Sequence, residues 1–187
     1  MKRLGPGLGL LLLCASVPAW AQEAPVTTPT RDVDVMYRST AGSQVLEQRS
    51  RYRAADGKLR LDTPSPGLYM IVDQRARTMA MVSDPDRGVV DVKFRGNVGP
   101  GGFTGGQGFT RQGADRVAGL PCTEWQTTDR QGQAVSACFT ADGVLLRARR
   151  GATVLVEATR VTYGPLDPAA FTVPPSYSHA AAPERRP

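Results

Sequence analysis

Residues 68–94, which read LYMIVDQRARTMAMVSDPDRGVVDVKF, decide the fold class. Three short apolar runs, at 68–73, 77–83 and 89–94, are rich in Val, Ile, Met and Tyr, and polar turns with Asp, Gly, Pro or Gln separate them. Runs of this length with turns at this spacing are typical of antiparallel strands joined by hairpins. The stretch therefore predicts three consecutive strands of a β-meander.

The same alternation continues on both sides of this stretch. Residues 45–53 place Leu46 and Tyr52 on one side and a row of charged residues on the other. The further predicted strands begin near Val33 and lie at 58–63, 122–128, 133–139, 144–150 and 153–163. We therefore predict an all-β, mainly antiparallel fold: one curved, half-barrel-like meander of about ten strands, whose only helical candidate is Pro168 to Phe171.

The first 21 residues have the pattern of a cleaved secretory signal peptide. Lys2 and Arg3 precede a short apolar run, and Ala19-Trp20-Ala21 is a small-x-small cleavage site. The run is too short to span a bilayer, and we expect no transmembrane segment after cleavage. The pattern predicts export to the periplasm of a Gram-negative bacterium, with a flexible lead-in at 22–30, one β-domain at 31–178 and a disordered tail at 179–187.

Cys14 lies inside the apolar run and not at its end. A lipidated cysteine normally follows a small residue after such a run, whereas Cys14 follows Leu12 and Leu13. We therefore expect Cys14 to be discarded with the signal peptide.

Charge and composition argue against a nucleic-acid partner. Removal of Lys2 and Arg3 leaves 21 basic residues against 17 acidic ones, and only Lys58 and Lys93 among the remaining residues are lysines. No basic cluster is interleaved with aromatic residues, as nucleic-acid-binding surfaces usually are.

The remaining pair of cysteines, Cys122 and Cys138, predicts a disulfide. In an oxidising compartment an even number of cysteines indicates pairing. Both lie in strand-like segments on either side of a turn at 129–132. If Thr128 faces Gly132, the two cysteines lie directly opposite each other in a hairpin. A redox-active pair is disfavoured, because the Cys-x-x-Cys spacing is absent.

The sequence contains no recognisable catalytic constellation. Its one histidine, His179, lies in the predicted tail, so a histidine-based triad or zinc site is not expected. The carboxylate pairs Asp32/Asp34 and Asp84/Asp86 are explained by a solvated strand face and a turn, and calcium binding at 84–86 lacks further ligands. We predict a non-enzymatic protein without cofactor or metal.

Residues 96–108 (GNVGPGGFTGGQG) form a glycine-rich loop. A phosphate-binding loop would end in Lys-Ser/Thr before a helix, and this one continues into Phe109-Thr110-Arg111. We expect a mobile loop whose Phe103 and Phe109 pack on the sheet or on a ligand.

Four methionines remain after signal cleavage, and all lie on first-half strands. They are Met36, Met70, Met79 and Met81. These methionines are compatible with ordinary core packing, with an adaptable apolar pocket or with a copper(I) site. No neighbouring His or Cys supports the copper site.

Several segments resemble the DUF4412-type family of bacterial envelope proteins. The resemblance is carried by GLYMIVD (67–73), TMAMV (78–82), VAGLPCTEW (117–125), ACFTADGV (137–144) and DPAAFTVPPSY (167–177). The last segment is also similar to the ending of periplasmic lipoprotein-carrier folds, in which a curved antiparallel sheet forms a half-barrel. The resemblance covers about residues 31–178 and implies a curved sheet whose concave side holds an apolar group. Helices that would act as a lid over such a sheet are not predicted here.

From fold and resemblance together we expect a lipid or other apolar group on the concave face. A single curved sheet without covering helices must hide its inner face, with its own loops or with a ligand. The candidate face residues are Leu46, Tyr52, Leu59, Leu61, Met70, Met79 and Met81, with Phe103 and Phe109 as a lid. The alternative is an envelope interaction or scaffold protein that fills its own core and presents the Arg-rich strand 45–53 to a protein partner.

Overall fold

The structure is a computed structural model that describes residues 24–41, 44–96, 98–99, 106–129 and 131–181. The predicted signal peptide and residues 182–187 of the predicted tail lie outside the described residues. Twelve strands run through the chain: β1 (Val33–Ala41), β2 (Gln44–Arg53), β3 (Lys58–Asp62), β4 (Leu68–Asp73), β5 (Thr78–Ser83), β6 (Gly88–Lys93), β7 (Gln107–Val117), β8 (Leu120–Thr128), β9 (Ala134–Phe139), β10 (Leu145–Arg150), β11 (Thr153–Tyr163) and β12 (Ser178–Ala181). The one helix described is the 3₁₀ helix η2 (Pro168–Phe171).

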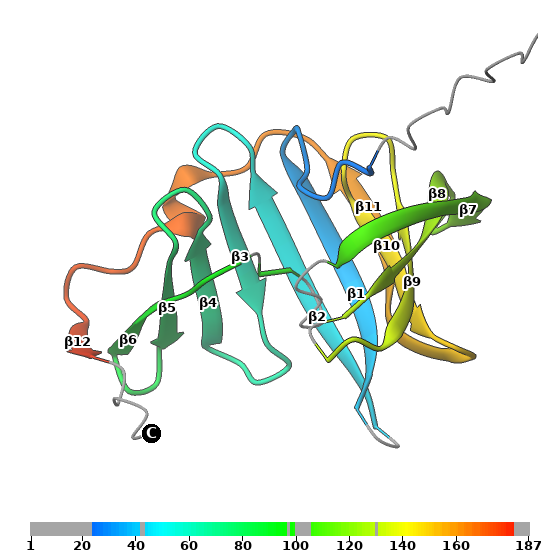
Figure 1. Cartoon of the computed structure of the whole chain (residues 1–187). Coiled ribbons are helices and arrows are strands. Elements are labelled where there is room, and N and C mark those ends of the chain that lie inside the picture. Colours follow the sequence, from blue (N-terminus) through cyan, green and yellow to red (C-terminus); the bar gives the residue numbers. More distant parts are fainter. Residues whose placement is uncertain (1–23, 42–43, 97, 100–105, 130, 182–187) are drawn as a thin grey trace, which may run out of the picture.

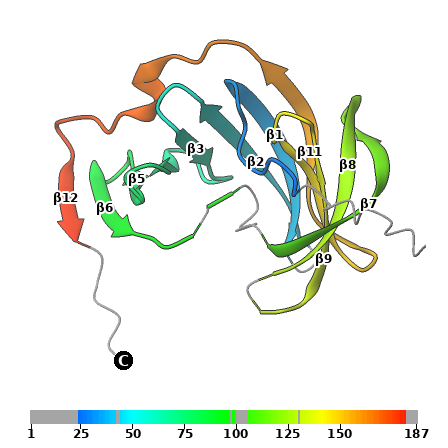
Figure 2. The same ribbon diagram turned by 45° about the horizontal axis from the view of Figure 1, so that its top comes forward.

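All twelve strands belong to one curved sheet that is not closed (Figure 1). The order is β12-β6-β5-β4-β3-β2-β1-β11-β10-β9-β8-β7, so two antiparallel meanders, β1–β6 and β7–β11, meet where β1 pairs with β11. Seen from the end, the sheet curves around a concave side (Figure 2). The prediction of an all-β, curved antiparallel sheet is confirmed.

Two strands were not predicted, which raises the count from about ten to twelve. β7 forms one edge of the sheet, and residues 110–116 within it are all exposed. A strand without a buried side has no apolar alternation to reveal it. The second, β12, pairs in parallel with β6, and its partners are Ser178↔Gly88 and His179↔Val89. The prediction of a disordered tail from His179 is therefore wrong for residues 179–181.

Cross-strand pairing assigns opposite chemistry to the two faces of the sheet. On the concave face Tyr52 pairs with Leu59 and Leu61 with Met70. The convex face carries arginine–carboxylate pairs, among them Arg49–Asp34 at 2.5 Å and Arg51–Asp62 at 2.6 Å, measured between nitrogen and oxygen. Strands with a period of two place apolar residues toward a core and charges toward water, so the concave side is the main core.

The convex side has a smaller core of its own, built over β4–β6. Four buried side chains form it: Tyr69, Ile71, Val82 and Val89. They pack against Val173 and Tyr177 of residues 172–177, which we call the C-terminal segment. The helix η2 precedes this segment, begins after Asp167, whose carboxylate accepts a hydrogen bond from the Ala169 amide, and buries Phe171. The C-terminal segment thus covers the part of the convex face where apolar side chains replace the charged pairs.

The structure places Cys122 and Cys138 at disulfide-bonding distance, with Sγ atoms 2.15 Å and Cα atoms 5.5 Å apart. The predicted register is wrong by two residues: Cys138 faces Glu124, Thr128 faces Ala134, and the cysteines are diagonal neighbours on the convex face. The Asp129 carboxylate accepts hydrogen bonds from the Gln131 and Gln133 amides and so stabilises a longer loop than expected. A shift of two residues keeps both cysteines on the same face, which preserves the pair.

Candidate functional site

The seven candidate residues on strands all lie on the concave face. Leu46 and Tyr52 have the same orientation on β2, and from Tyr52 the pairing continues through Leu59 and Val72 to Met79. Leu61 pairs with Met70, which pairs with Met81. The alternation in the sequence thus predicted correctly which side chains share a face.

These residues differ in how far the protein itself covers them. Tyr52, Leu59 and Leu61 are buried in the main core, while Met70 and Met79 are half-buried against it. Met81 is 47% exposed although it is a large apolar side chain. The concave face is therefore filled from β1 to Val72 of β4 and more exposed over β5 and β6.

Phe109 lies at the other end of the concave face. Its ring contacts Trp125 and Phe139 edge-on, with ring centroids 6.4 Å and 6.3 Å apart. It packs on β8 and β9 and does not cover the methionines of β4 and β5. Phe103, the second candidate lid residue, lies outside the described residues.

An extended segment at residues 24–30, which we call the strap, lies against the turn that joins β9 to β10. The Thr30 amide donates to the Asp142 carbonyl at 3.0 Å. At Gly143 the backbones approach so closely that an added Cβ would lie 2.3 Å from the Thr28 carbonyl oxygen. Gly143 also has a φ of +90°, which favours glycine. The predicted flexible lead-in is thus a packed part of the domain.

Arg31 anchors the strap where it enters β1. Its Nε lies 2.7 Å from Asp142 Oδ2, and its guanidinium stacks 3.7 Å from the centre of the Tyr163 ring. The Tyr163 hydroxyl donates to Asp142 Oδ1 at 3.1 Å. Arg31, Asp142 and Tyr163 therefore form one cluster that joins the strap to β11 and the β9–β10 turn.

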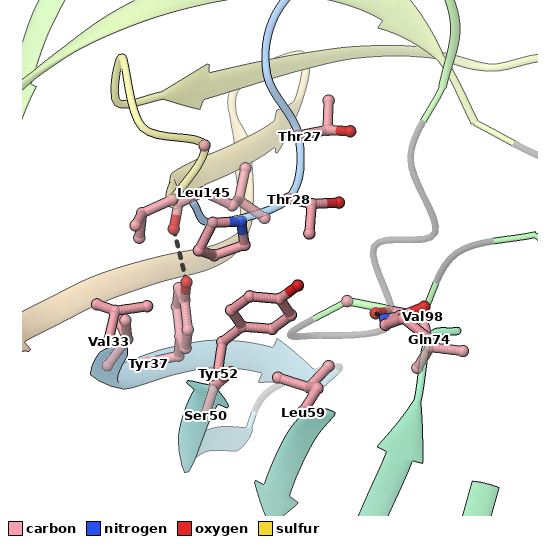
Figure 3. Close-up of a pocket in the computed structure, with 15 residues that line it drawn as sticks. Thr27, Thr28, Val33, Tyr37, Ser50, Tyr52, Leu59, Gln74, Val98 and Leu145 are labelled. Atoms are coloured by element: carbon pink, nitrogen blue, oxygen red, sulfur yellow. Dashed lines mark hydrogen bonds between the residues drawn. The ribbon is translucent and has the colours of Figure 1, made fainter. Parts of the chain in front are cut away.

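One side of the strap lines a cavity of about 70 Å³ (Figure 3). Thr27, Thr28 and Pro29 contribute from the strap, and the opposite wall comes from β1, β2 and β3. That wall consists of Val33, Val35, Tyr37, Ser50, Tyr52 and Leu59. The Tyr37 hydroxyl donates to the Leu145 carbonyl at 2.6 Å, which satisfies the most polar group of this wall.

The other part of the strap lines a second, wider cavity of about 580 Å³. Ala24, Pro25 and Val26 contribute from the strap. The sheet side consists of Arg111, Thr123, Trp125, Phe139, Thr140 and Ala141. The strap therefore lies between two cavities that face the same side of the sheet.

The described residues that follow β6 are 94–96 and 98–99. The Gln74 side-chain amide donates to the Val98 carbonyl at 2.8 Å, and Phe94 and Val98 pack on the main core. Of the predicted mobile loop, residues 97 and 100–105 lie outside the described residues.

The described lining of the two cavities is almost uncharged. Among the described residues that line them there is no Asp, Glu, His or Cys, and Arg111 is the one charged side chain. Burial raises the pKa of Tyr37 far above its ordinary value and also raises the pKa of Tyr52. Burial therefore favours the protonated, uncharged form of both tyrosines.

The described residues contain no group of three or more His, Cys, Asp or Glu side chains that could hold a metal. His179 pairs with Asp91, with Nδ1 and Oδ2 2.6 Å apart, at the parallel junction of β12 and β6. Met36 lies on the opposite face from Met70, since it pairs with Arg49 and Arg160 on the convex side.

Sequence reasoning missed the strap and the cavity over β8 and β9. The strap has two prolines and no periodicity, which is equally typical of a flexible leader. Trp125 and Phe139 share a face through Ala137, and an aromatic pair in one hairpin is a signal that could have indicated the second cavity.

The anchor of the strap gives a prediction for acid stability. Burial acts to raise the pKa of Asp142, but hydrogen bonds from Thr140, Arg31 and Tyr163 outweigh it and hold this pKa below the ordinary 3.8. Backbone amides, together with arginines, lower the pKa of Asp115 and Asp129. A carboxyl with a lowered folded pKa binds fewer protons when folded, so its stabilisation is complete above about pH 5 and is lost as the pH falls below about 4.

The urea concentration at the midpoint of unfolding, measured in steps from about pH 7 to about pH 2.5, should therefore stay constant down to about pH 5. It should then decrease as the pH falls below about 4. Asp142→Asn should reduce the size of the fall, because one of the responsible groups no longer titrates. A midpoint that rises on acidification would contradict the prediction.

Comparisons with known proteins support the fold. No family model matches the chain, so the DUF4412 resemblance has no support from that source, and no curated protein matches it. Among solved structures, an uncharacterized conserved protein from Thermus thermophilus has a TM-score of 0.59 at 11% identity, over 82% of this chain and 91% of that one. MucB has a TM-score of 0.52 at 14% identity, over 81% of this chain and 60% of MucB.

MucB also matches in the MucA/MucB complex of Pseudomonas aeruginosa, with a TM-score of 0.51 at 13% identity, over 78% of this chain and 56% of that one. The chain thus spans little more than half of MucB. No helix in the described part of the chain is long and apolar enough to cross a membrane. At these identities the similarity establishes a shared fold: the chain has the curved, open antiparallel sheet that is also found in MucB.

Proposed function

We propose that this protein is an exported, non-enzymatic envelope protein that binds a lipid or another apolar group on the concave face of its sheet. The support comes from the apolar character of that face and from the predicted signal peptide. In this proposal the protein acts in the periplasm of a Gram-negative bacterium.

The observation that carries the proposal is the partly exposed apolar surface over β5 and β6, at the edge of the buried core. Met70 pairs with Met81, and Met81 pairs with Val90; in the neighbouring row Val72 pairs with Met79. Met81 is 47% exposed, and the others on β5 and β6 are only partly covered. Contiguous apolar surface facing water is costly and marks an interaction site, and methionine side chains adapt to varied apolar ligands.

The chemistry of the cavities supports binding and not catalysis. General acid–base catalysis requires a group that titrates near the working pH within reach of the substrate. The described lining supplies tyrosines with raised pKa values, hydroxyls and one arginine. These groups can orient a ligand but do not form a nucleophile with its base.

A second candidate function is binding of a protein partner, with a core that the protein fills itself. The concave face over β1–β3 is filled largely by its own side chains and by the strap, and the structural neighbour MucB is found in complex with MucA. The Arg-rich strand β2 is a poor candidate for the partner surface, because Arg49, Arg51 and Arg53 pair with Asp34, Asp62 and Asp56.

Native mass spectrometry of the exported protein, followed by organic extraction and lipid analysis, tests the proposal. We expect a stoichiometric adduct that extracts as lipid. Met81→Arg should reduce uptake of added lipid at least tenfold, because a guanidinium would be buried against apolar ligand atoms. Val45→Arg is the matched control: Val45 is 60% exposed and lies on the convex face, so uptake should not change.

A clean mass without adduct, together with no uptake of added lipid, would overturn the lipid proposal. Co-purification of a protein partner under those conditions would favour the second candidate. Equal loss of uptake in Met81→Arg and Val45→Arg would show that added charge, and not the concave face, is responsible.

A further inference from the structure

The strap occupies part of the surface on which the proposed ligand would bind. It lies between the two cavities, with residues 27–29 lining the first and residues 24–26 the second. The first cavity, at about 70 Å³, is smaller than the roughly 150 Å³ that holds a benzene molecule. While the strap is in place, the concave face near β1–β3 therefore has no room for a long apolar chain.

The strap is chemically similar to an apolar ligand. Residues 24–30 read APVTTPT: they carry no charge, and Pro25 and Pro29 have no backbone N–H. The segment is irregular and one chain wide, and it lies along the walls of both cavities. A linear chain without charge can fill such cavities without leaving a buried ionic group unpaired.

The strap is hydrogen-bonded at one end only, while Val26 and Thr28 pack against Gly143. Residues 24–29 form no hydrogen bond to any described residue, whereas Thr30 and Arg31 are bound to Asp142. Val26 is 47% exposed, so even its largest apolar side chain is only partly packed. Segments with few buried contacts and no hydrogen bonds open at low free-energy cost.

From this geometry we propose that the strap is a displaceable occupant of the concave face, and that an unbranched acyl chain binds by taking its place. Release of the strap would join the two cavities into one channel from Tyr52 and Leu59 to Trp125 and Phe139. Arg31 and Asp142 form the hinge about which the strap leaves. This inference rests on the proposed function, because it names the ligand class and a device that controls how much of the same concave face is available.

Displacement predicts how strap variants alter affinity. If the open form is a fraction f of the molecules, the apparent Kd equals the intrinsic Kd divided by f. Deletion of residues 24–29 removes the competitor, and Arg31→Ala loosens its anchor. If the strap is closed in nine molecules of ten, deletion lowers the apparent Kd about tenfold, with Arg31→Ala in between.

The test is titration of the exported protein with cis-parinaric acid, an 18-carbon fatty acid that becomes fluorescent in an apolar site. We expect about tenfold tighter binding after deletion and a smaller gain for Arg31→Ala. Arg160→Ala is the control, since this exposed arginine lies on the convex side of β11 opposite Met36. Circular dichroism should show the same strand content in every variant.

A second measurement follows the strap in the intact protein. Thr27→Cys introduces a half-buried thiol in the strap, and its rate of maleimide labelling should rise when cis-parinaric acid is added. Equal affinity of the parent and the deleted chain, or a labelling rate that falls with ligand, would overturn the displacement inference alone. If neither chain binds the fatty acid, both the proposed function and this inference are overturned.

Discussion

Replacement of both Cys122 and Cys138 with alanine is expected to lower the free energy of unfolding by about 3 kcal/mol. The disulfide closes a loop with a sequence separation of 16 residues, and the chain-entropy model gives about this value for such a loop. Both cysteines are buried, so alanine is preferred to serine, which would bury a hydroxyl without a partner.

Urea unfolding with and without a reductant measures this effect. The reductant should lower the midpoint of the parent protein toward that of the double variant and leave the variant unchanged. A parent midpoint that does not respond to the reductant while unfolding is reversible would contradict a stabilising disulfide. The effect should be general to the domain, since β8 and β9 are internal strands of the single sheet.

Phe171→Ala is expected to destabilise the protein by about 3 kcal/mol or more. Phe171 is 1% exposed and is the largest fully buried side chain among the described residues. It belongs to η2, which contacts β3 and is held there by a hydrogen bond from Arg60 to the Ala170 carbonyl at 3.0 Å. Its truncation leaves a cavity under the segment that carries β12 to the edge of the sheet.

Thermal unfolding and hydrogen exchange together test this prediction. The melting temperature should fall, and the β12 amides that bond to β6 should exchange faster, because the C-terminal segment loses its main apolar contact. Val45→Ala, at a side chain that is 60% exposed, should change stability by less than about 0.5 kcal/mol. A Phe171→Ala protein as stable as the parent would show that the C-terminal segment contributes little to the fold.

Much of the local structure could be predicted because side-chain alternation reports it directly. The alternation in β2, β3, β4 and β5 identified both the strands and the side chains that share the concave face. Pro168 to Phe171 was predicted as the helical candidate, and it forms η2. These features depend on neighbours one to four positions away in the chain, so a sequence displays them.

The missed features depend on partners far away in the chain. β12 becomes a strand because the edge of β6 offers it hydrogen bonds, and the strap packs because Gly143 lets it approach the β9–β10 turn. The register of the cysteine hairpin is a local exception: the Asp129 carboxylate accepts from the Gln131 and Gln133 amides and stabilises a five-residue loop, where the turn pattern predicted a three-residue one. None of these contacts leaves a period in the local sequence.

The amino-acid sequence by itself thus determined the β class, the two chemical faces of the alternating strands β2 to β5 and the cysteine pair. Tertiary structure decided the strand order, with β1 joined to β11, and therefore which part of the apolar face is filled and which stays open. The reason is that side-chain direction along a strand follows from backbone geometry alone. Coverage of a face depends on segments distant in sequence, such as the strap and residues 171–177, which pack on the sheet only when the whole chain folds.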